Sequence, residues 1–162
     1  YFIIRNIGKV RSSLTEDAAM TIVHAFISSK LDHMNSLHFG NTKHLLQKLQ
    51  KLQNNSARII VKAKRRDHIS PVLKRLHWLP VDKRIEFKIL LTTFKAMTGL
   101  APGYIHDLLE PYQPHRALRS MDLTYLRKPR SRTKTFGDRA FASSAPYLWN
   151  KQPRTLRQCV EL

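Results

Sequence analysis

The segment RDHISPVLKRLHWLPVDKRIEFKILLTTFKAMTGLAPGYIHDLL, from Arg66 to Leu109, contains a helical pattern over residues 81–98 that is apolar on two opposite faces. One face carries Phe87, Leu90, Leu91 and Phe94, and the other carries Ile85, Ile89 and Ala96. A helix of this kind must be covered on two sides. Pro80 precedes it and Gly99 follows it, where a left-handed C-terminal cap is expected. We therefore expect residues 81–98 to form the central buried helix of the fold.

The chain before this segment also has helical signals. Thr15 is a good N-cap for a helix whose apolar residues recur at helical spacing, and residues 43–64 carry the longest helical pattern. Ser70 followed by Pro71 predicts a short helix, and Trp78 is expected to pack in the core. The expected fold class is mainly α, a helical bundle around one central buried helix, with a basic loop or a short β-hairpin near the C-terminus.

The composition is strongly basic: 29 lysines and arginines against 11 acidic residues give a formal net charge of +18. Such a charge favours RNA or DNA as the partner, because polyanions relieve the self-repulsion of the folded chain. An anionic membrane surface is the weaker alternative, since the charges are spread along the chain and do not gather on one short amphipathic helix. The single cysteine, Cys159, rules out an intrachain disulfide and favours an intracellular location, nuclear or cytoplasmic.

A row of polar, mostly basic residues follows one face of the pattern over residues 43–64. Its members are Lys48, Lys51, Asn55, Arg58 and Lys62, and the row is about 21 Å long at 1.5 Å per residue. Such a row can follow a phosphate backbone, each cation displacing a counterion. An ordinary solvated helix face is the alternative interpretation. A second row on the same pattern is apolar and consists of Leu45, Leu49, Leu52, Ile59 and Ala63, with Ser56 as its polar member. This row can instead form a coiled-coil seam or bind a protein partner.

Helical periodicity is lost over residues 113–138, where cations dominate. The candidate nucleic-acid-binding residues of this segment are Arg127, Lys128, Arg130, Arg132 and Lys134. Cations alternate there with hydroxyl side chains, which also contact phosphate oxygens. Residues 123–127 and 133–136 are candidates for a short hairpin. We expect two domains, a helical one at 1–112 and a basic C-terminal extension at 113–162 that packs back on it.

Constellations of catalytic or metal-binding residues are missing from the sequence. The adjacent acids Glu16 and Asp17 suit the first turn of a helix, where negative charge is favourable. His33 and His38 have ligand-like spacing, but no second cysteine accompanies Cys159. Phosphate-binding and dinucleotide-binding motifs and a nucleophile elbow are also absent. We therefore expect no catalytic residue, metal site or cofactor in this chain.

Several long blocks of the sequence resemble, in order, the C-terminal region of the reverse transcriptase of non-LTR (LINE-like, jockey-type) retrotransposons, a class of transposable elements. The blocks are LTEDAAMTIVHAFISSKLDHMNSL at 14–37, LQKLQNNSARII at 49–60, DHISPVLKRLHWLPVDKRIEFKILLTTFKAMTGLAPGYI at 67–105 and PRSRTKTFGDRAFASSAPYLWN at 129–150. Met34 stands where members of the family often have a cysteine, so the resemblance brings no metal site.

The resemblance implies a thumb-like helical fragment, downstream of the polymerase palm, that holds template and primer or target DNA by its backbone. It implies an RNA-directed DNA polymerase whose catalytic palm lies upstream of Tyr1, so this fragment is not expected to be an enzyme on its own. The expected partners are RNA or DNA and the upstream palm, with no membrane. A different class remains open: a non-catalytic helical protein-interaction module or a retroelement remnant. The sequence does not distinguish RNA from DNA.

Overall fold

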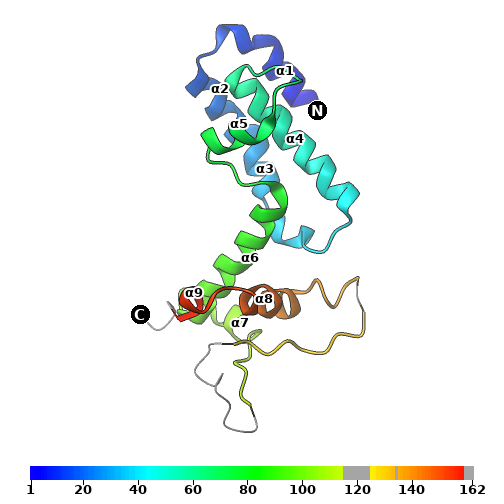
Figure 1. Cartoon of the computed structure of the whole chain (residues 1–162), viewed down its shortest axis with the longest axis vertical. Coiled ribbons are helices and arrows are strands. Elements are labelled where there is room, and N and C mark those ends of the chain that lie inside the picture. The colour runs from blue at the N-terminus through cyan, green and yellow to red at the C-terminus, as the bar shows by residue number, and fades with distance from the viewer. Residues whose placement is uncertain (115–124, 134, 159–162) are drawn as a thin grey trace. The chain divides into compact units, whose positions relative to one another are not determined.

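The protein is mainly α-helical in a computed structural model that describes residues 1–114, 125–133 and 135–158. Figure 1 shows the helices, which are α1 (Phe2–Val10), α2 (Glu16–Val23), α3 (Ser29–Asp32), α4 (Lys43–Val61), α5 (Ile69–Arg75), α6 (Val81–Met97), α7 (Gly103–His106), α8 (Phe141–Asn150) and α9 (Arg154–Gln158). A π-helical turn at His24–Ser28 joins α2 to α3, and 3-10 turns lie at Arg11–Ser13 and Asn35–His38. The prediction of a mainly α fold is confirmed.

The chain forms two compact units, Tyr1–Arg84 and Ile85–Leu162, called unit 1 and unit 2 below. The division falls inside α6, which is continuous from Val81 to Met97. The sequence suggested a division at residue 112, where helical periodicity stops. A division inside a regular helix leaves no such compositional signal.

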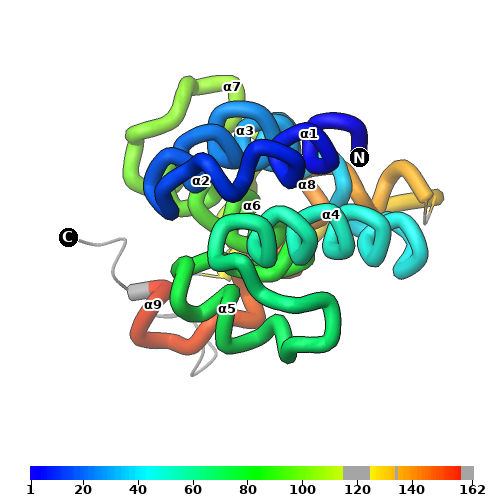
Figure 2. The backbone as a smooth tube through the Cα atoms, turned by 90° about the horizontal axis from the view of Figure 1, so that it is seen from above, coloured from blue at the N-terminus to red at the C-terminus, as the bar shows by residue number. Residues whose placement is uncertain are grey.

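Unit 1 packs α1, α2, α4 and α5 around one hydrophobic core, with α1, α2 and α5 all against α4. Figure 2 shows this arrangement, with α1 and α2 on one side of α4 and α5 on another. The core consists of Ile4, Ile7, Val23, Ile27, Ala57, Ile60, Leu73, Leu76 and Trp78. The expected core position of Trp78 is confirmed, and so is the N-cap at Thr15, whose side-chain oxygen accepts a hydrogen bond from the Ala18 amide at 3.2 Å.

The buried face of α4 coincides only in part with the apolar row of the sequence. Its fully buried residues are Gln53, Ser56, Ala57 and Ile60. Ser56 is the polar member of that row, whereas Leu45 is 46% exposed and Leu49, Leu52, Ile59 and Ala63 are half-buried. Ser56 and Ala57 are small, so neighbouring helices can approach the α4 backbone closely. Gln53 and Ser56 are stable inside the protein because both side chains are hydrogen-bonded.

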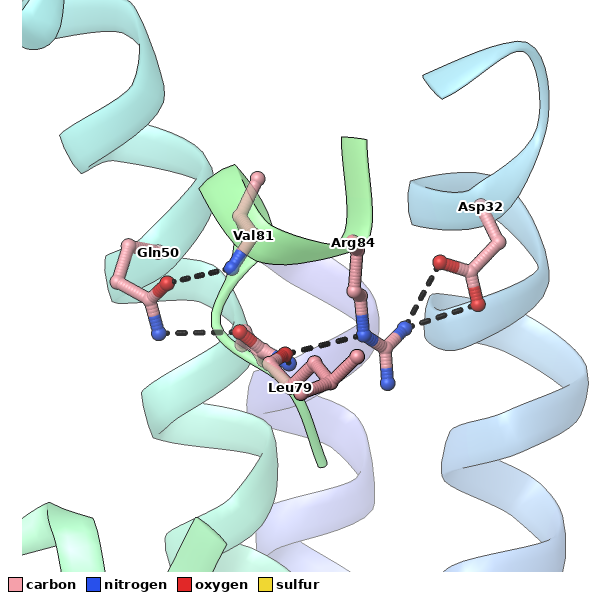
Figure 3. A network of polar contacts seen from close by, with 6 residues as sticks. Asp32, Gln50, Leu79, Val81 and Arg84 are labelled. Atoms are coloured by element: carbon pink, nitrogen blue, oxygen red, sulfur yellow. Dashed lines mark hydrogen bonds and ion pairs between the residues drawn. The ribbon is translucent and has the colours of Figure 1, made fainter. Parts of the chain in front are cut away.

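Two glutamines of α4 hold the segment that leads into α6. The Gln53 side-chain amide donates to the Leu79 carbonyl at 2.8 Å, and the Gln50 side-chain oxygen accepts from the Val81 amide at 2.8 Å. Figure 3 shows the bond between Gln50 and Val81 together with Arg84, which donates from Nε to the Leu79 carbonyl and from Nη1 to both carboxylate oxygens of Asp32 at 2.8 Å. These bonds satisfy the backbone where α6 begins and fix its first turn in unit 1.

Helix α6 buries one of its two predicted apolar faces. Val81, Ile85, Ile89, Thr93 and Ala96 are buried, and the Thr93 hydroxyl donates to the Ile89 carbonyl. On the other face Phe87 is 55% exposed, so the expectation of cover on both sides was wrong for that residue. The predicted C-terminal cap is confirmed. Gly99 has φ of 73°, and the Leu100 amide donates to the Lys95 carbonyl at 2.8 Å, as in a Schellman motif.

A buried arginine, Arg11, joins the end of α1 to the end of α4. Its side chain donates to the carbonyls of Ile59 at 2.7 Å, Ile60 at 2.6 Å and Leu14 at 2.6 Å. Arg11 is 8% exposed. The negative end of the α4 dipole and three carbonyl oxygens therefore stabilise the buried guanidinium in place of a carboxylate.

We expect Arg11→Met to destabilise α4 by about 2–4 kcal/mol, because each hydrogen bond from a charged group contributes about 1.5–3 kcal/mol and the buried carbonyls lose their donors. The measurement is the free energy of opening of the α4 amides by hydrogen exchange. Arg5→Met removes an exposed cation from α1 and is the control. Equal exchange in both variants would contradict the assigned role of Arg11.

Candidate nucleic-acid interface

Helix α4 carries exposed lysines away from its buried face. At about 100° per residue, Lys51 lies roughly half a turn and Lys48 roughly a third of a turn from the centre of the buried face, and Lys62 is the C-cap residue that follows the helix. All three are exposed, and no ion pair involves them within the part of the chain that the structure describes. Between Lys43 and Arg66 the sequence has eight lysines and arginines and no acidic residue. This face is therefore uniformly positive.

Arg58, the fourth predicted residue of the stripe, has a different position. It is half-buried, and its Nη2 donates to the Asp67 carbonyl at 3.2 Å. The Asp67 carboxylate in turn accepts from the Lys64 amide at 2.7 Å. Lys62, with φ of 55°, ends the helix just before this turn. Arg58 therefore braces the turn that carries the exposed cations Lys64, Arg65 and Arg66, and it points less freely to solvent than the lysines.

In unit 2 the basic segment begins with a short antiparallel pairing. Pro111 lies opposite Leu126, the Tyr112 amide donates to the Tyr125 carbonyl at 2.9 Å, and the Arg127 amide donates to the Glu110 carbonyl at 2.8 Å. We call residues 110–112 and 125–127 the ribbon. Pro111 occupies the pair that exchanges no hydrogen bond, so its missing N–H costs nothing there.

The expected hairpin between residues 123–127 and 133–136 is not formed by its described members. Residues 125–127 pair with 110–112 instead, and residues 135–139 form turns. Of the two predicted alternatives, a basic loop and a short hairpin, the described residues form the loop. The hairpin prediction was wrong because the partner of residues 125–127 is residues 110–112, which lie too far back in the sequence for a short-range pattern to identify.

The side chain of Asn150, on α8, completes the ribbon on its other edge. Its Nδ2 donates to the Leu126 carbonyl at 2.8 Å, and its Oδ1 accepts from the Leu126 amide at 3.0 Å. Leu126 itself is 1% exposed. One side-chain amide thus satisfies both backbone groups that the ribbon leaves unpaired, and it ties the start of the basic loop to a buried helix.

The cations of the loop fall into two kinds. Arg127 pairs with the Glu110 carboxylate at 3.1 Å, and Lys128 pairs with Asp138 at 3.6 Å. These pairs are solvent-exposed, so each contributes little and is easily exchanged for a phosphate. Arg130 and Arg132 are exposed and have no ion-pair partner within the described part of the chain. Lys134 lies outside the described residues.

The hydroxyl groups of the loop mostly serve its own turn. The Ser131 hydroxyl donates to the Thr133 carbonyl at 2.9 Å, and the Thr133 hydroxyl oxygen accepts from the Gly137 amide at 3.0 Å. A Cβ at Gly137 would lie 2.0 Å from the Ser131 side-chain oxygen, so a larger residue there would displace the Ser131 hydroxyl. The predicted phosphate contact by these hydroxyls stays a prediction, and for Ser131 it would replace the bond to the Thr133 carbonyl.

An open hollow of about 570 Å³ lies beside the paired and unpaired cations of the loop. It is lined by Glu110, Arg127, Lys128, Pro129 and Arg130.

Two residues of this region were not identified from the sequence: Asn150, which bonds to the edge of the ribbon, and Glu110, which pairs with Arg127. A lone asparagine late in an apolar segment carries no signal that its side chain will replace a strand.

Neither metal nor membrane features accompany these surfaces. Among the described residues no group of three or more histidines, cysteines or acids could hold a metal ion, and none of the described helices is long and apolar enough to span a membrane. Comparisons with models of known protein families, with curated proteins and with solved structures found no match. The resemblance to the retrotransposon family therefore stays a prediction.

We expect Asn150→Ala to speed exchange of the Leu126 amide roughly 5- to 100-fold, because two hydrogen bonds contributing about 0.5–1.5 kcal/mol each are removed. The measurement is residue-resolved hydrogen exchange by NMR. Asn150→Asp keeps the acceptor for the Leu126 amide but places a carboxylate against the Leu126 carbonyl, so it too should loosen the ribbon. Arg154→Ala, an exposed change on α9, is the control. An unchanged exchange rate of the Leu126 amide in Asn150→Ala would refute the role of Asn150 in holding the ribbon.

Proposed function

We propose that the chain binds the sugar-phosphate backbone of RNA or DNA, using the outer face of α4 in unit 1 and the basic loop in unit 2. The observation that carries the proposal is the lysine face of α4 and its C-cap, which is exposed, has no ion-pair partner in the described part of the chain and includes no acidic residue. An ordinary solvated helix usually mixes charges of both signs. A face of one sign attracts polyanions and gains affinity by releasing their counterions.

Within this proposal the chain is the C-terminal, thumb-like part of a non-LTR retrotransposon reverse transcriptase. It holds the template and primer, or the target DNA, next to a catalytic palm supplied by the upstream chain. It performs no chemistry itself. This assignment rests on the sequence resemblance over residues 14–37, 49–60, 67–105 and 129–150, and the charged surfaces support it.

A protein-interaction role is the second candidate, favoured by an apolar groove on unit 1. The groove has a volume of about 310 Å³ and is lined by Tyr1, Ile3, Ile4, Phe26, Ile27, Lys30, Leu31, Leu49 and Leu52. Phe26 is 53% exposed there. Apolar surface of this kind marks contact sites. The groove and the lysine face are different surfaces of α4, so one experiment separates the two functions.

Replacing Lys48, Lys51 and Lys62 together by glutamine should weaken binding to a labelled duplex. The slope of log affinity against log salt should become shallower by up to about 0.9 for each lysine that contacts a phosphate. The measurement is fluorescence anisotropy of the full chain over a series of salt concentrations, with RNA and DNA duplexes in parallel.

The matched control neutralises Lys9, Lys30 and Lys74, three exposed lysines of unit 1 outside α4, and so removes the same charge. If Lys48, Lys51 and Lys62 contact the phosphates directly, the control variant should keep the wild-type slope. Equal losses in both triple variants would mean that only net charge matters and would refute the α4 face as the interface. Absence of binding by the wild type at low salt would favour the protein-interaction role.

The unpaired loop arginines give a separate test for unit 2. Arg130→Gln with Arg132→Gln should reduce affinity and flatten the salt dependence, because these guanidiniums have no ion-pair partner among the described residues and are free to contact phosphates. Lys88→Gln with Lys95→Gln removes the same charge from exposed positions of α6 and should have little effect. Indistinguishable salt titrations of the two double variants would exclude the loop from the interface.

A further inference from the structure

One face of the ribbon in unit 2 brings an aromatic ring and polar groups together beside the basic loop. Side chains alternate between the two faces of an extended pair, so Glu110 and Tyr112 share a face with Tyr125 and Arg127, and the buried Leu126 is on the other. The ion pair between Glu110 and Arg127 across the ribbon agrees with this register.

The two tyrosines on this face differ in what covers them. The Arg157 guanidinium lies 4.0 Å from the centre of the Tyr125 ring, and Arg157 is 5% exposed, so one arginine already caps Tyr125. Tyr112 is 48% exposed, and its ring has no aromatic or cationic contact within the described residues. An uncovered, half-exposed ring on a fixed backbone is a stacking platform.

A second hollow lies next to Tyr112. It has a volume of about 540 Å³ and is lined by Glu110, Pro111, Tyr112, Gln113 and Arg127. It shares Glu110 and Arg127 with the 570 Å³ hollow that contains Lys128 and Arg130. Both volumes fall within the range of about 300–1,000 Å³ that small-ligand sites occupy. An aromatic and amide-lined hollow therefore adjoins a cationic one.

We propose that this pair of hollows binds an unpaired nucleotide of a single-stranded RNA or DNA segment. The base stacks on the Tyr112 ring, the Glu110 carboxylate and the Gln113 amide face its polar edge, and the adjoining phosphates lie toward Arg127, Lys128 and Arg130. A base inside a duplex has both faces covered by its neighbours, so only an unpaired base can use Tyr112. The inference rests on the proposed function, because it assumes a nucleic-acid ligand.

The test compares a short single-stranded oligonucleotide with the duplex of the same length, using the full chain and fluorescence anisotropy at one salt concentration. Tyr112→Ala should weaken single-strand binding about tenfold or more and leave duplex binding within about twofold, whereas Tyr112→Phe, which keeps the ring, should bind as the wild type does. Tyr104→Ala, which truncates a 69% exposed tyrosine on α7, is the control. Oligo(U) and oligo(dT) probes distinguish RNA from DNA.

A second measurement does not depend on affinity. Trp78 and Trp149 are both buried, so Tyr112→Trp introduces an exposed indole whose fluorescence should be quenched when a base stacks on it. Single-strand binding that is equal in Tyr112→Ala and Tyr104→Ala, or an unquenched indole at saturating oligonucleotide, would overturn the stacking site while leaving backbone binding intact. If the wild type bound neither single strand nor duplex at low salt, both this inference and the proposed function would be overturned.

Discussion

The fold of unit 1 depends on a buried positive charge, that of Arg11, whose hydrogen-bond partners among the described residues are carbonyls and not acids. Arg11 donates to carbonyls at the end of α4, where the helix dipole places negative charge, and this contact joins two segments about 48 residues apart in the chain. The guanidinium is therefore both a helix cap and a long-range link. Its rigid fork suits this task, because it reaches three carbonyls at once, which a lysine ammonium on a flexible stem does less well. With the end of α4 fixed, α1, α2 and α5 can pack against its small buried residues.

A second set of polar contacts, at the middle of α4, fixes where α6 begins. Gln50 and Gln53 bind the backbone of Leu79 and Val81, and the Gln50 amide also donates to the Gln53 side-chain oxygen at 3.0 Å. Because each amide has several donors and acceptors satisfied, the buried Gln53 and the half-buried Gln50 are accommodated at low cost and specify one arrangement. Hydrophobic contacts alone are non-directional and would hold the same segment with less definition.

The sequence predicted the elements whose signals are local, and it failed where distant groups decide the structure. The N-cap at Thr15, the glycine cap after α6 and the core position of Trp78 each follow from residues a few positions apart, and all are confirmed. The burial of Gln53 on α4 has no local signal, because its side chain bonds to a carbonyl 26 residues away. The hairpin was wrong for a similar reason: residues 110–112 bond to the backbone of Tyr125 and Arg127, and Asn150 bonds to that of Leu126, all from far along the chain. For the candidate interface, composition identified the cations, and only the structure separated those that point outward from those that brace a turn.

That separation follows the chemistry of the two basic side chains. In unit 1 four arginines bind structural partners: Arg11 and Arg58 bind carbonyls, and the side chains of Arg75 and Arg84 pair with Glu16 and Asp32. The lysines on the outer face of α4 keep their charge available to solvent, and a hydrated ammonium is a non-directional point charge that suits contact with phosphates of any sequence. In unit 2 the order is reversed, since the unpaired cations Arg130 and Arg132 are planar forks suited to bidentate phosphate contacts. The net charge of +18 therefore overstates the charge that is exposed and unpaired among the described residues, and the proposed function assigns a different kind of phosphate contact to each unit.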